Sequence, residues 1–420
     1  MKTKSLLLYD KNDLRLEEYE LPPVGGGELL VKIMSDSLCM SSYKASLQGA
    51  DHKRVPDNVS ENPIIIGHEF CGEILEVGDS LRQSGKYRPG MRFSIQPAMK
   101  GTYEAAGYSF RYLGGDTQYA IIPKCYIDHD CVLPYKGDAW YKASMAEPVS
   151  CVIGAAHACY HTETGSYEHR MGTREKGKIA ALAAAGPMGL AMLDYIIHGG
   201  RAPSLLVVTD IDQSRLDRAA SILTPQEAAA HGVKLIYLNT NGCADPAAAL
   251  RGFTGGDGYD DVFVFAPVAP VVEQADSILG YDGCLNFFAG PSDHGFKAKF
   301  NFYNVHYNAT HIVGTSGGNT DDMKEALDLA AAGKINPSIL ITHVGGLDAA
   351  RGATLRLPEI PGGKKLIYTH ISMPLTAIAD FGALGENDPL FAGLAQICAR
   401  NGGLWSAEAE AFLLENAAGI

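Results

Sequence analysis

The 420-residue chain lacks the cysteine pattern of a disulfide framework or of a four-cysteine zinc knuckle. Its nine cysteines are an odd number, and no two of them have C-x-x-C spacing. A long basic run is also missing, and the net charge is −13. Because so acidic a chain repels phosphodiester backbones, we expect no nucleic-acid partner.

Long uninterrupted hydrophobic runs are missing as well. The N-terminal segment turns charged at Asp10, which is too early for a secretory signal. The longest apolar stretch, residues 179–197, contains Gly186, Pro187 and Asp194, so it does not read as a membrane-spanning helix. We therefore expect no membrane partner and a cytoplasmic location.

The pattern of apolar, polar and turn-forming residues changes along the chain and predicts three segments. Residues 1–150 contain partly alternating strands such as "ELLVKIMSDSL" and "MRFSIQPAM", punctuated by Gly and Pro. Residues 151–314 alternate short apolar strands with helices, which is typical of a doubly wound parallel sheet. Residues 315–420 return to strand texture and end in an extension for which the sequence suggests no function. The polar stretch 160–177 is predicted to be a long surface loop.

A candidate coenzyme loop, "AAAGPMG", stands between a predicted strand and a predicted helix. Gly186 and Gly189 match the second and third glycines of the dinucleotide fingerprint, but Ala184 replaces the first. Asp210 lies at the end of the next strand, where an acid binds the adenosine ribose and repels a 2′-phosphate. This pattern predicts a nicotinamide dinucleotide site and favours NAD(H) over NADP(H), a choice that Arg215 could soften. The predicted coenzyme-binding residues are Gly186, Pro187, Met188, Gly189, Asp210 and Arg215.

Four residues form a candidate metal set only when they are taken together. Alone, Cys39 reads as a small core residue, His68 as a structural histidine and Glu147 as a solvated acid. Their order carries more information: a cysteine at a strand end, then His68-Glu69 after a Gly, then a Glu-Pro just before the dinucleotide fold.

These motifs resemble the zinc-dependent medium-chain dehydrogenase/reductase superfamily. The segments "IIIGHEFCGEILEVG", "AEPVSCVIGA", "GPMGL" and "VVTDIDQSRL" occur in the family's order, and the match runs from about residue 25 to 370. Further segments, such as "SDSLCMSSYK" and "VGTSGGNTDDM", resemble its L-sorbose-1-phosphate reductase branch. The resemblance implies an α/β architecture in which a β-rich GroES-like catalytic domain is split by an inserted Rossmann domain.

The resemblance also implies one open catalytic zinc site. Cys39 and His68 would bind the ion, and Glu69 and Glu147 would supply the carboxylate side, where they can trade places. The family's structural zinc lobe would fall near residues 97–112, which contain no cysteine, so no structural zinc is predicted. Ser41 matches the family's relay hydroxyl. Lys44 stands where some relatives carry a relay histidine, although it reads equally well as a surface lysine.

The expected function is a zinc- and NAD(H)-dependent oxidoreductase that interconverts L-sorbose 1-phosphate and D-glucitol 6-phosphate. The alternatives are a dehydrogenase of a free polyol or another sugar phosphate, and a non-enzymatic dinucleotide-binding protein. The resemblance further implies a homo-oligomer, either a dimer or a tetramer. The candidates for binding a substrate phosphate are His52, Lys53, Arg54 and Arg111, which read otherwise as solvated surface cations.

Overall fold

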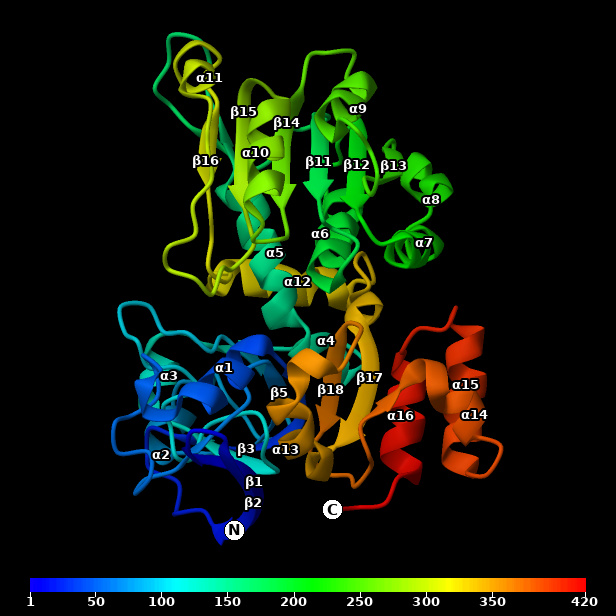
Figure 1. The fold of residues 1–420 in the computed structure, drawn as a ribbon. Coiled ribbons are helices and arrows are strands. Elements are labelled where there is room, and N and C mark those ends of the chain that lie inside the picture. The colour runs from blue at the N-terminus through cyan, green and yellow to red at the C-terminus, as the bar shows by residue number, and fades with distance from the viewer. The chain divides into compact units, whose positions relative to one another are not determined.

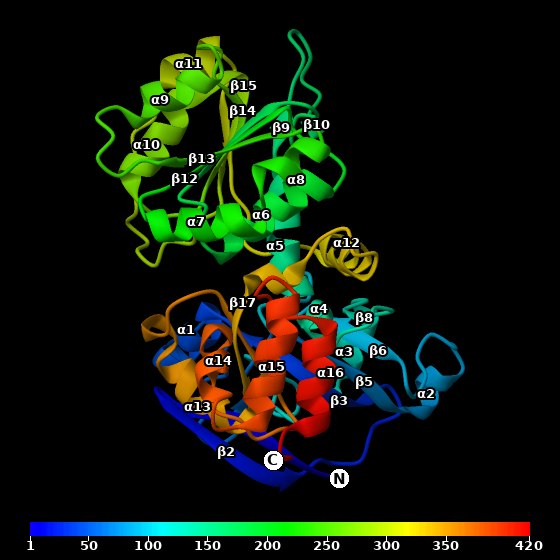
Figure 2. The ribbon, with the colours of Figure 1, turned by 90° about the vertical axis from the view of Figure 1, so that its right-hand side faces the viewer.

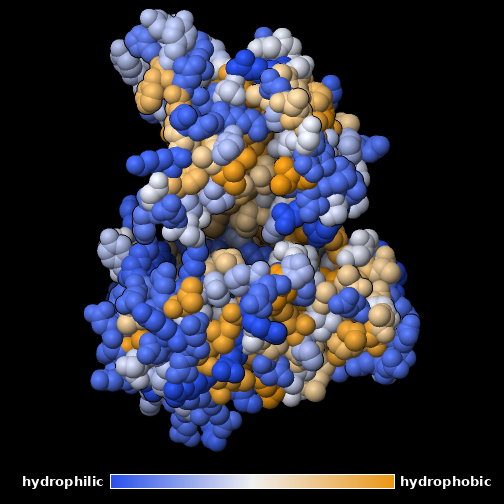
Figure 3. Space-filling model, in the orientation of Figure 1, coloured by the Kyte–Doolittle hydropathy of each residue, from blue (hydrophilic) through white to orange (hydrophobic).

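The computed structural model describes all residues from Met1 to Ile420. The chain folds into two compact units, coloured along the sequence in Figure 1. Unit 1 consists of Met1–Glu147, Met323–Ala332 and Pro337–Ile420, and unit 2 of Pro148–Asp322 and Gly333–Asn336. No helix is both long and apolar enough to cross a bilayer. Hydrophobic residues are scattered in small groups over the face of each unit seen in Figure 3.

Unit 2 is built on a six-stranded sheet in which all neighbouring strands run parallel. Its order is β13-β12-β11-β14-β15-β16, the arrangement of a doubly wound dinucleotide-binding fold (Figure 1). The strands are β11 (Lys178–Leu182), β12 (Leu205–Asp210), β13 (Lys234–Asn239), β14 (Tyr259–Val264), β15 (Leu279–Phe287) and β16 (His311–Val313).

Helices lie on both faces of this sheet, with α9 and α10 on one face and α6 on the other (Figure 2). Because both faces are covered, strands such as β12, with the sequence LLVVTD, are buried along their whole length. The helices are α5 (Ala146–Ala158), α6 (Pro187–His198), α7 (Gln213–Ile222), α8 (Pro225–Ala230), α9 (Pro246–Phe253), α10 (Ala269–Ile278) and α11 (Phe302–Tyr307).

The segment 160–177, predicted to be a continuous surface loop, contains a short antiparallel hairpin. Its strands are β9 (Tyr160–His161) and β10 (Arg170–Met171), and β9 packs against β15. The loop prediction was therefore wrong at the two strands of this hairpin, where pairing anchors the segment to the unit.

Unit 1 is β-rich and is assembled from both ends of the chain. Its larger sheet has the order β19-β17-β18-β3-β5-β6-β8, and β7 also pairs with β3. These strands are β3 (Leu29–Leu38), β5 (Phe70–Val77), β6 (Arg92–Ile95), β7 (Tyr119–Ile122), β8 (Val132–Pro134), β17 (Ile341–Gly346), β18 (Lys364–Tyr368) and β19 (Thr376–Ala377). A second sheet joins β2 (Asp13–Glu20), β1 (Lys2–Asp10) and β4 (Ile64–Ile65). Because β18 pairs with β3 across the insertion, the predicted split β-rich domain is confirmed.

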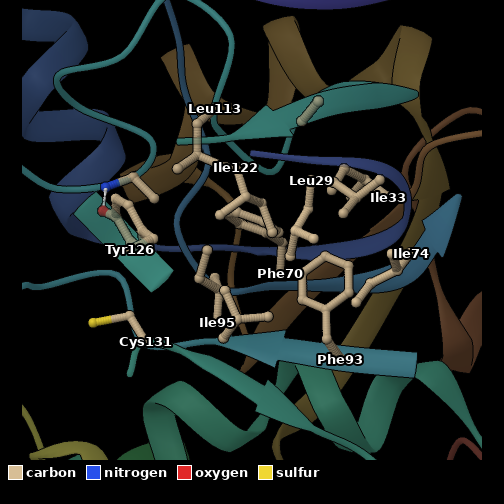
Figure 4. Close-up of a cluster of buried hydrophobic side chains, with 14 of the residues drawn as sticks. Leu29, Ile33, Phe70, Ile74, Phe93, Ile95, Leu113, Ile122, Tyr126 and Cys131 are labelled. Carbon is tan, nitrogen blue, oxygen red and sulfur yellow. Dashed lines mark hydrogen bonds between the residues drawn. The ribbon is translucent and has the colours of Figure 1, made fainter. Parts of the chain in front are cut away.

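The core of unit 1 fills the space beside β3 and β5. Leu29, Ile33, Phe70 and Ile74 pack there with Phe93 of β6 and are almost fully buried (Figure 4). The helices of this part of the chain are short except near its end: α1 (Met40–Gln48), α2 (Asp79–Arg82), α3 (Lys124–Asp128), α4 (Trp140–Ser144), α12 (Thr320–Ala331), α13 (Leu347–Leu355), α14 (Phe381–Leu384), α15 (Pro389–Arg400) and α16 (Ala407–Asn416). Single 3-10 turns occupy Gly49–Asp51, Pro337–Leu340, Leu357–Glu359 and Ile378–Asp380.

The C-terminal extension is helical (Figure 2). It is joined to the rest of unit 1 through a buried carboxylate. The oxygens of Glu410 on α16 accept hydrogen bonds from the backbone N–H groups of Trp140 at 2.5 Å and Tyr141 at 2.8 Å. They also accept one from the Tyr368 hydroxyl at 2.7 Å, which in turn accepts one from Trp405 Nε1 at 2.8 Å. The extension thus caps the start of α4, the helix that precedes Glu147 in the chain.

Candidate functional site

The end of β3 and the turn before β5 bring the first three predicted metal ligands to one place. Cys39 follows the last residue of β3 and caps α1. Gly67 has φ +89°, a left-handed conformation that favours glycine, and a Cβ there would lie 2.8 Å from an Asp36 carboxylate oxygen. This turn directs His68 and Glu69 back beneath the end of β3, where Ser37 N–H donates to the Glu69 carbonyl at 3.0 Å.

The ligand atoms of Cys39, His68 and Glu69 all lie within 4.8 Å of one another. His68 and Glu69 are buried, and Cys39 is half-buried. One thiolate, one imidazole and one carboxylate form a donor set that suits zinc, and three protein ligands leave a position open for substrate or water. The residues present therefore fit a catalytic zinc ion.

Two hydroxyl groups orient the His68 ring. Ser42 Oγ lies 3.1 Å and the Tyr108 hydroxyl 3.0 Å from His68 Nδ1. On the other side of the ring, Nε2 is 4.0 Å from a Glu69 carboxylate oxygen. A partner on one ring nitrogen that fixes the direction of the other is the usual arrangement around a metal-binding histidine.

Lys364, from β18, adds a largely buried cation to this group. Its ammonium lies 2.5 and 2.6 Å from the two oxygens of Glu69, and the Ser37 hydroxyl donates to the same carboxylate. Burial by itself would raise the pKa of Glu69, but the Lys364 ammonium holds that pKa below its ordinary value. Burial and the Glu69 charge raise the pKa of the Cys39 thiol.

Glu147 lies in the first turn of α5, and its charge interacts with the same group. Burial, followed by the charge of Glu69, raises the pKa of Glu147 to about 7. Burial also lowers the pKa of His68. Cys39, Glu69 and Glu147 thus lie near a single ammonium group, that of Lys364. When these acidic groups ionise, the excess of negative charge favours a further cation, which a divalent ion would supply.

The proposed relay residues lie on α1, next to Cys39. The Ser41 hydroxyl is 3.0 Å from Cys39 Sγ, so it lies next to the position of an ion bound by that sulfur. Lys44 follows one helical turn later and is half-buried, and no contact joins it to Cys39 or His68.

Two of the four predicted phosphate-binding residues lie beside the metal group. The His52 ring stacks on Tyr108 at 5.6 Å, and the Arg54 guanidinium lies 5.6 Å from the centre of the same ring. Tyr108 thus connects both side chains to His68. Lys53 between them is exposed. Arg111 is not brought to this group, because it lies over Tyr112 instead.

The coenzyme loop of unit 2 has room for a diphosphate. Gly186 caps the N-terminus of α6, and a Cβ at this residue would meet no atom within 4 Å. At Gly189, by contrast, a Cβ would lie 2.0 Å from the Ala184 carbonyl oxygen, so glycine permits close packing of helix and loop. Pro187, which has no N–H of its own, begins the helix, and the backbone N–H groups of Met188 and Gly189 follow it at the helix end. The loop therefore fits the pyrophosphate of a dinucleotide.

Asp210 lies at the end of β12 and ties the strand to this loop. Its carboxylate accepts hydrogen bonds from Ala185 N–H at 3.3 Å, Ile211 N–H at 2.9 Å and Asp212 N–H at 3.1 Å. Arg215 is exposed and pairs with Asp212 at 3.6 Å, not with Asp210. The structure thus brings Asp210 to the loop, whereas Arg215 is directed to a different acid.

Sequence reasoning missed Lys364, Tyr108 and Ser42. Lys364 stands in the strand-like segment "GKKLIYTHI", and its partner Glu69 is 295 residues away. A lysine at the start of an apolar strand was the available signal. Tyr108 lies in the cysteine-free segment 97–112, where the family pattern pointed only to a structural zinc.

Two family models match the chain. One, described as "Zinc-binding dehydrogenase", matches residues 187–332, and one described as "Alcohol dehydrogenase GroES-like domain" matches residues 25–129.

Full-length relatives also match. The chain is 54% identical over 415 residues to "uncharacterized protein YggP" of Escherichia coli K12, covering 99% of this chain and 97% of that protein. It is 53% identical over 414 residues to mannitol-1-phosphate 5-dehydrogenase of Aliivibrio fischeri (98% and 97% covered). It is 47% identical over 420 residues to L-sorbose 1-phosphate reductase of Klebsiella pneumoniae (100% and 98% covered).

Solved structures share the fold at low sequence identity. A 2R,3R-butanediol dehydrogenase from Bacillus subtilis has a TM-score of 0.68 at 19% identity, with 87% of this chain and 99% of that chain covered. A zinc-binding dehydrogenase from Sinorhizobium meliloti, bound to NADP, has a TM-score of 0.68 at 18% identity, with 88% and 99% covered. These similarities support the fold alone.

Proposed function

The chain belongs to the zinc-binding dehydrogenase family, and from this premise we propose that it interconverts a hexitol phosphate and a ketose phosphate with NAD(H). The preferred pair is L-sorbose 1-phosphate and D-glucitol 6-phosphate. The observation that carries the proposal is the convergence of Cys39, His68 and Glu69 within 4.8 Å. The full-length similarity to a protein named L-sorbose 1-phosphate reductase supports the substrate class.

Zinc, when bound, polarises the substrate carbonyl, and the nicotinamide ring supplies or accepts the hydride. Cys39 and His68 would hold the ion, with Glu69 or Glu147 as the carboxylate ligand. Ser42 and Tyr108 fix the direction of the His68 ring.

A proton must reach the substrate oxygen when a ketose is reduced, and the chain offers a route for it. The Ser41 hydroxyl, 3.0 Å from Cys39 Sγ, would donate that proton and recover one from solvent. Lys44, one turn further along α1, is the next candidate in this relay.

A substrate phosphate would meet Arg54 and His52 at the Tyr108 ring. A guanidinium that lies over an aromatic ring has little freedom, so its donors are directed before the phosphate arrives. In unit 2, Asp210 favours NAD(H), because its carboxylate accepts hydrogen bonds from a ribose and repels a 2′-phosphate.

A second candidate substrate is mannitol 1-phosphate, which differs from glucitol phosphates in hydroxyl configuration. The full-length relative named mannitol-1-phosphate 5-dehydrogenase, at 53% identity, favours it. Both candidates use the same metal and coenzyme sites.

We further propose that the protein is cytoplasmic and forms a homo-oligomer. The strand β16 lies at the edge of its sheet, and Ile312 on it is 45% exposed, so a second copy could extend the sheet there. Size-exclusion chromatography with light scattering would measure the mass in solution, and a monomer would contradict this part of the proposal.

The test combines metal analysis with a substrate panel. Freshly purified protein should contain zinc and should oxidise NADH with ketose phosphates but much more slowly with the free ketoses. Cys39→Ala should lose the catalytic zinc and turnover together, whereas Cys243→Ala, outside the site, should keep both. Full activity in metal-free Cys39→Ala protein would contradict the proposal. NADH binding without turnover on any polyol or ketose would favour a non-enzymatic protein.

A further inference from the structure

A second group of metal-binding side chains is buried in unit 2, on one face of its sheet. Asp261 of β14, Cys284 of β15 and His311 of β16 are register partners in three adjacent parallel strands. Because register partners direct their side chains to the same face, these residues form a row across the sheet. This row is separate from the coenzyme loop, which follows β11.

Two more donors reach the row from the segment between α5 and β9. Cys159 follows the end of α5, and its Sγ, Cys284 Sγ and an Asp261 oxygen all lie within 4.8 Å of one another. All three side chains are buried. His161, on β9, lies with Nε2 3.2 Å from Asp261 Oδ1. The ligand atoms of a tetrahedral zinc ion are roughly 3–4 Å apart, so Cys159, Cys284 and Asp261 need only small shifts to enclose one, whereas the His161 ring must also move toward the two thiols.

The His161 ring is oriented as a metal ligand would be. Its Nδ1 lies 3.0 Å from the Asp282 carbonyl oxygen, to which it can donate a proton. Nε2 faces Asp261 Oδ1 at 3.2 Å, and a metal ion bound between them would take the place of the proton on this nitrogen.

Two neighbouring side chains are committed to other partners. The Asp282 carboxylate accepts hydrogen bonds from Thr162 N–H at 3.0 Å and Oγ1 at 2.8 Å, and from Arg174 at 2.7 Å. His311 Nδ1 lies 2.9 Å from the Ala309 carbonyl oxygen, and Nε2 faces the Tyr160 carbonyl oxygen. The His311 ring also contacts Cys284. Outside this group, Cys159 Sγ makes only long contacts, 3.6 Å to the Ala155 carbonyl oxygen and 3.7 Å from Asn286 Nδ2, so the donor set best suited to an ion is two thiols, one carboxylate and one imidazole.

We propose that Cys159, Asp261, Cys284 and His161 bind a zinc ion that fixes the α5–β9 connection to the sheet. Two soft thiolates select zinc over magnesium or calcium, and four protein ligands leave no open position, as in a structural rather than a catalytic site. Two thiolates and a carboxylate exceed the charge of the ion by one. Asp261 Oδ2 accepts a hydrogen bond from the backbone N–H of Arg174 at 2.9 Å, and the guanidinium of the same residue pairs with Asp282 at 2.7 Å and with Asp260 at 3.1 Å. This ion goes beyond the single catalytic zinc expected from the sequence.

Metal stoichiometry tests the proposal on the full-length protein purified without chelators. Mass spectrometry of the metals should find two zinc ions per wild-type chain. Cys39→Ser should keep one, Cys284→Ser should keep one, and the double variant should keep none. Cys243→Ser, a cysteine of unit 2 outside the group, should keep both. A Cys284→Ser protein with the same zinc content as wild type would overturn the proposal.

Cobalt substitution gives a readout that is independent of turnover. In the Cys39→Ser background, bound Co²⁺ should still show strong thiolate-to-cobalt charge-transfer absorption, and adding Asp261→Asn or His161→Gln should weaken cobalt binding. If Cys284→Ser fails to fold, these two variants still decide the question. A Cys159–Cys284 disulfide in the purified protein, found by peptide mapping, would also overturn it. Failure of the proposed function would instead appear as zinc-loaded protein without turnover.

Discussion

The Lys364 ammonium lies 2.5 and 2.6 Å from the two carboxylate oxygens of Glu69, although 295 residues separate the pair in sequence. The Glu69 side chain is buried and that of Lys364 is largely buried, with exposed fractions of 1% and 11%. The Ser37 hydroxyl donates to the same carboxylate. Glu69 can therefore become a direct ligand of an ion only by giving up part of this pairing.

Replacing Lys364 by Met should destabilise the protein by about 3–5 kcal/mol, because it leaves a buried carboxylate without its cation. The free energy of unfolding, measured by urea titration in the presence of a chelator, checks this. The double variant Glu69→Gln/Lys364→Met should recover part of the loss. Lys124→Met, which breaks the exposed pair with Asp128, should cost only about 0.3–0.5 kcal/mol. If Lys364→Met and Lys124→Met lost equal unfolding free energy, the stabilising role given to the Lys364–Glu69 pair would be refuted.

Arg54→Ala should raise KM for a phosphorylated ketose by about 10- to 100-fold, the value of a charge-assisted hydrogen bond of about 1.5–3 kcal/mol. KM for the unphosphorylated ketose should stay the same. Lys53→Ala is the adjacent control, and its effect should be smaller, since that side chain is exposed. Arg111→Ala, over Tyr112, should change neither constant. A loss shared equally by both ketoses would show that Arg54 supports the Tyr108 ring rather than the phosphate.

Local patterns in the sequence were enough to predict most of the fold. The apolar strands, the Gly/Pro turn at Gly186 and the acid at Asp210 are each encoded within a few neighbouring residues. Metal candidates such as Cys39 and His68 were found from the order of the motifs along the chain and from the family resemblance, because each residue alone reads as a structural one.

Long-range register could not be predicted from the same patterns. Lys364 meets Glu69 only because β18 pairs with β3. Asp261 and Cys284 become neighbours only because β14 and β15 align at these two residues. A shift of one residue would turn either side chain to the opposite face, and the partner residue on the neighbouring strand cannot be read from one strand alone.

Asp210→Ser should shift the coenzyme preference toward NADP(H). The substitution removes the charge that repels a 2′-phosphate and an acceptor for the ribose hydroxyls. The ratio of kcat/KM for NADH to that for NADPH should fall by at least about 10-fold, a change of about 1.4 kcal/mol. Asp212→Asn keeps an oxygen for its cap of α7 and should leave the ratio nearly unchanged. A wild-type preference for NADPH would contradict the role given to Asp210.

Glu410→Gln should destabilise unit 1 by about 1–3 kcal/mol, because an amide offers one oxygen where the carboxylate offers two. Trp140 N–H, Tyr141 N–H and the Tyr368 hydroxyl all donate to this carboxylate, and at least one of these donors would lose its acceptor. Glu408→Gln on the same helix breaks only an exposed pair with Arg400 and should have little effect. Thermal unfolding of the two variants checks the difference, and similar midpoints would refute the role of Glu410.

His198 should make the stability of the protein depend on pH. A hydrogen bond from its ring to Asp194, with Nδ1 and Oδ1 2.7 Å apart, raises the pKa of His198 above its ordinary value near 6.5. Nε2 also faces Glu227 at 3.6 Å, and the ring packs against His231.

Because the folded state binds this proton more tightly than the unfolded state, the stabilisation is complete below about pH 6.5 and is lost as pH rises through the raised pKa. Urea unfolding of wild type and His198→Gln, compared on both sides of that window, isolates the effect. The difference in unfolding free energy between the two proteins should be largest at the acidic end and should shrink as the solution becomes alkaline. When Glu227→Gln is added to both proteins, the difference in unfolding free energy between them should fall only slightly, because Asp194 provides the stronger contact to His198. A difference that stays constant across the window would mean that His198 contributes only packing at the end of α6.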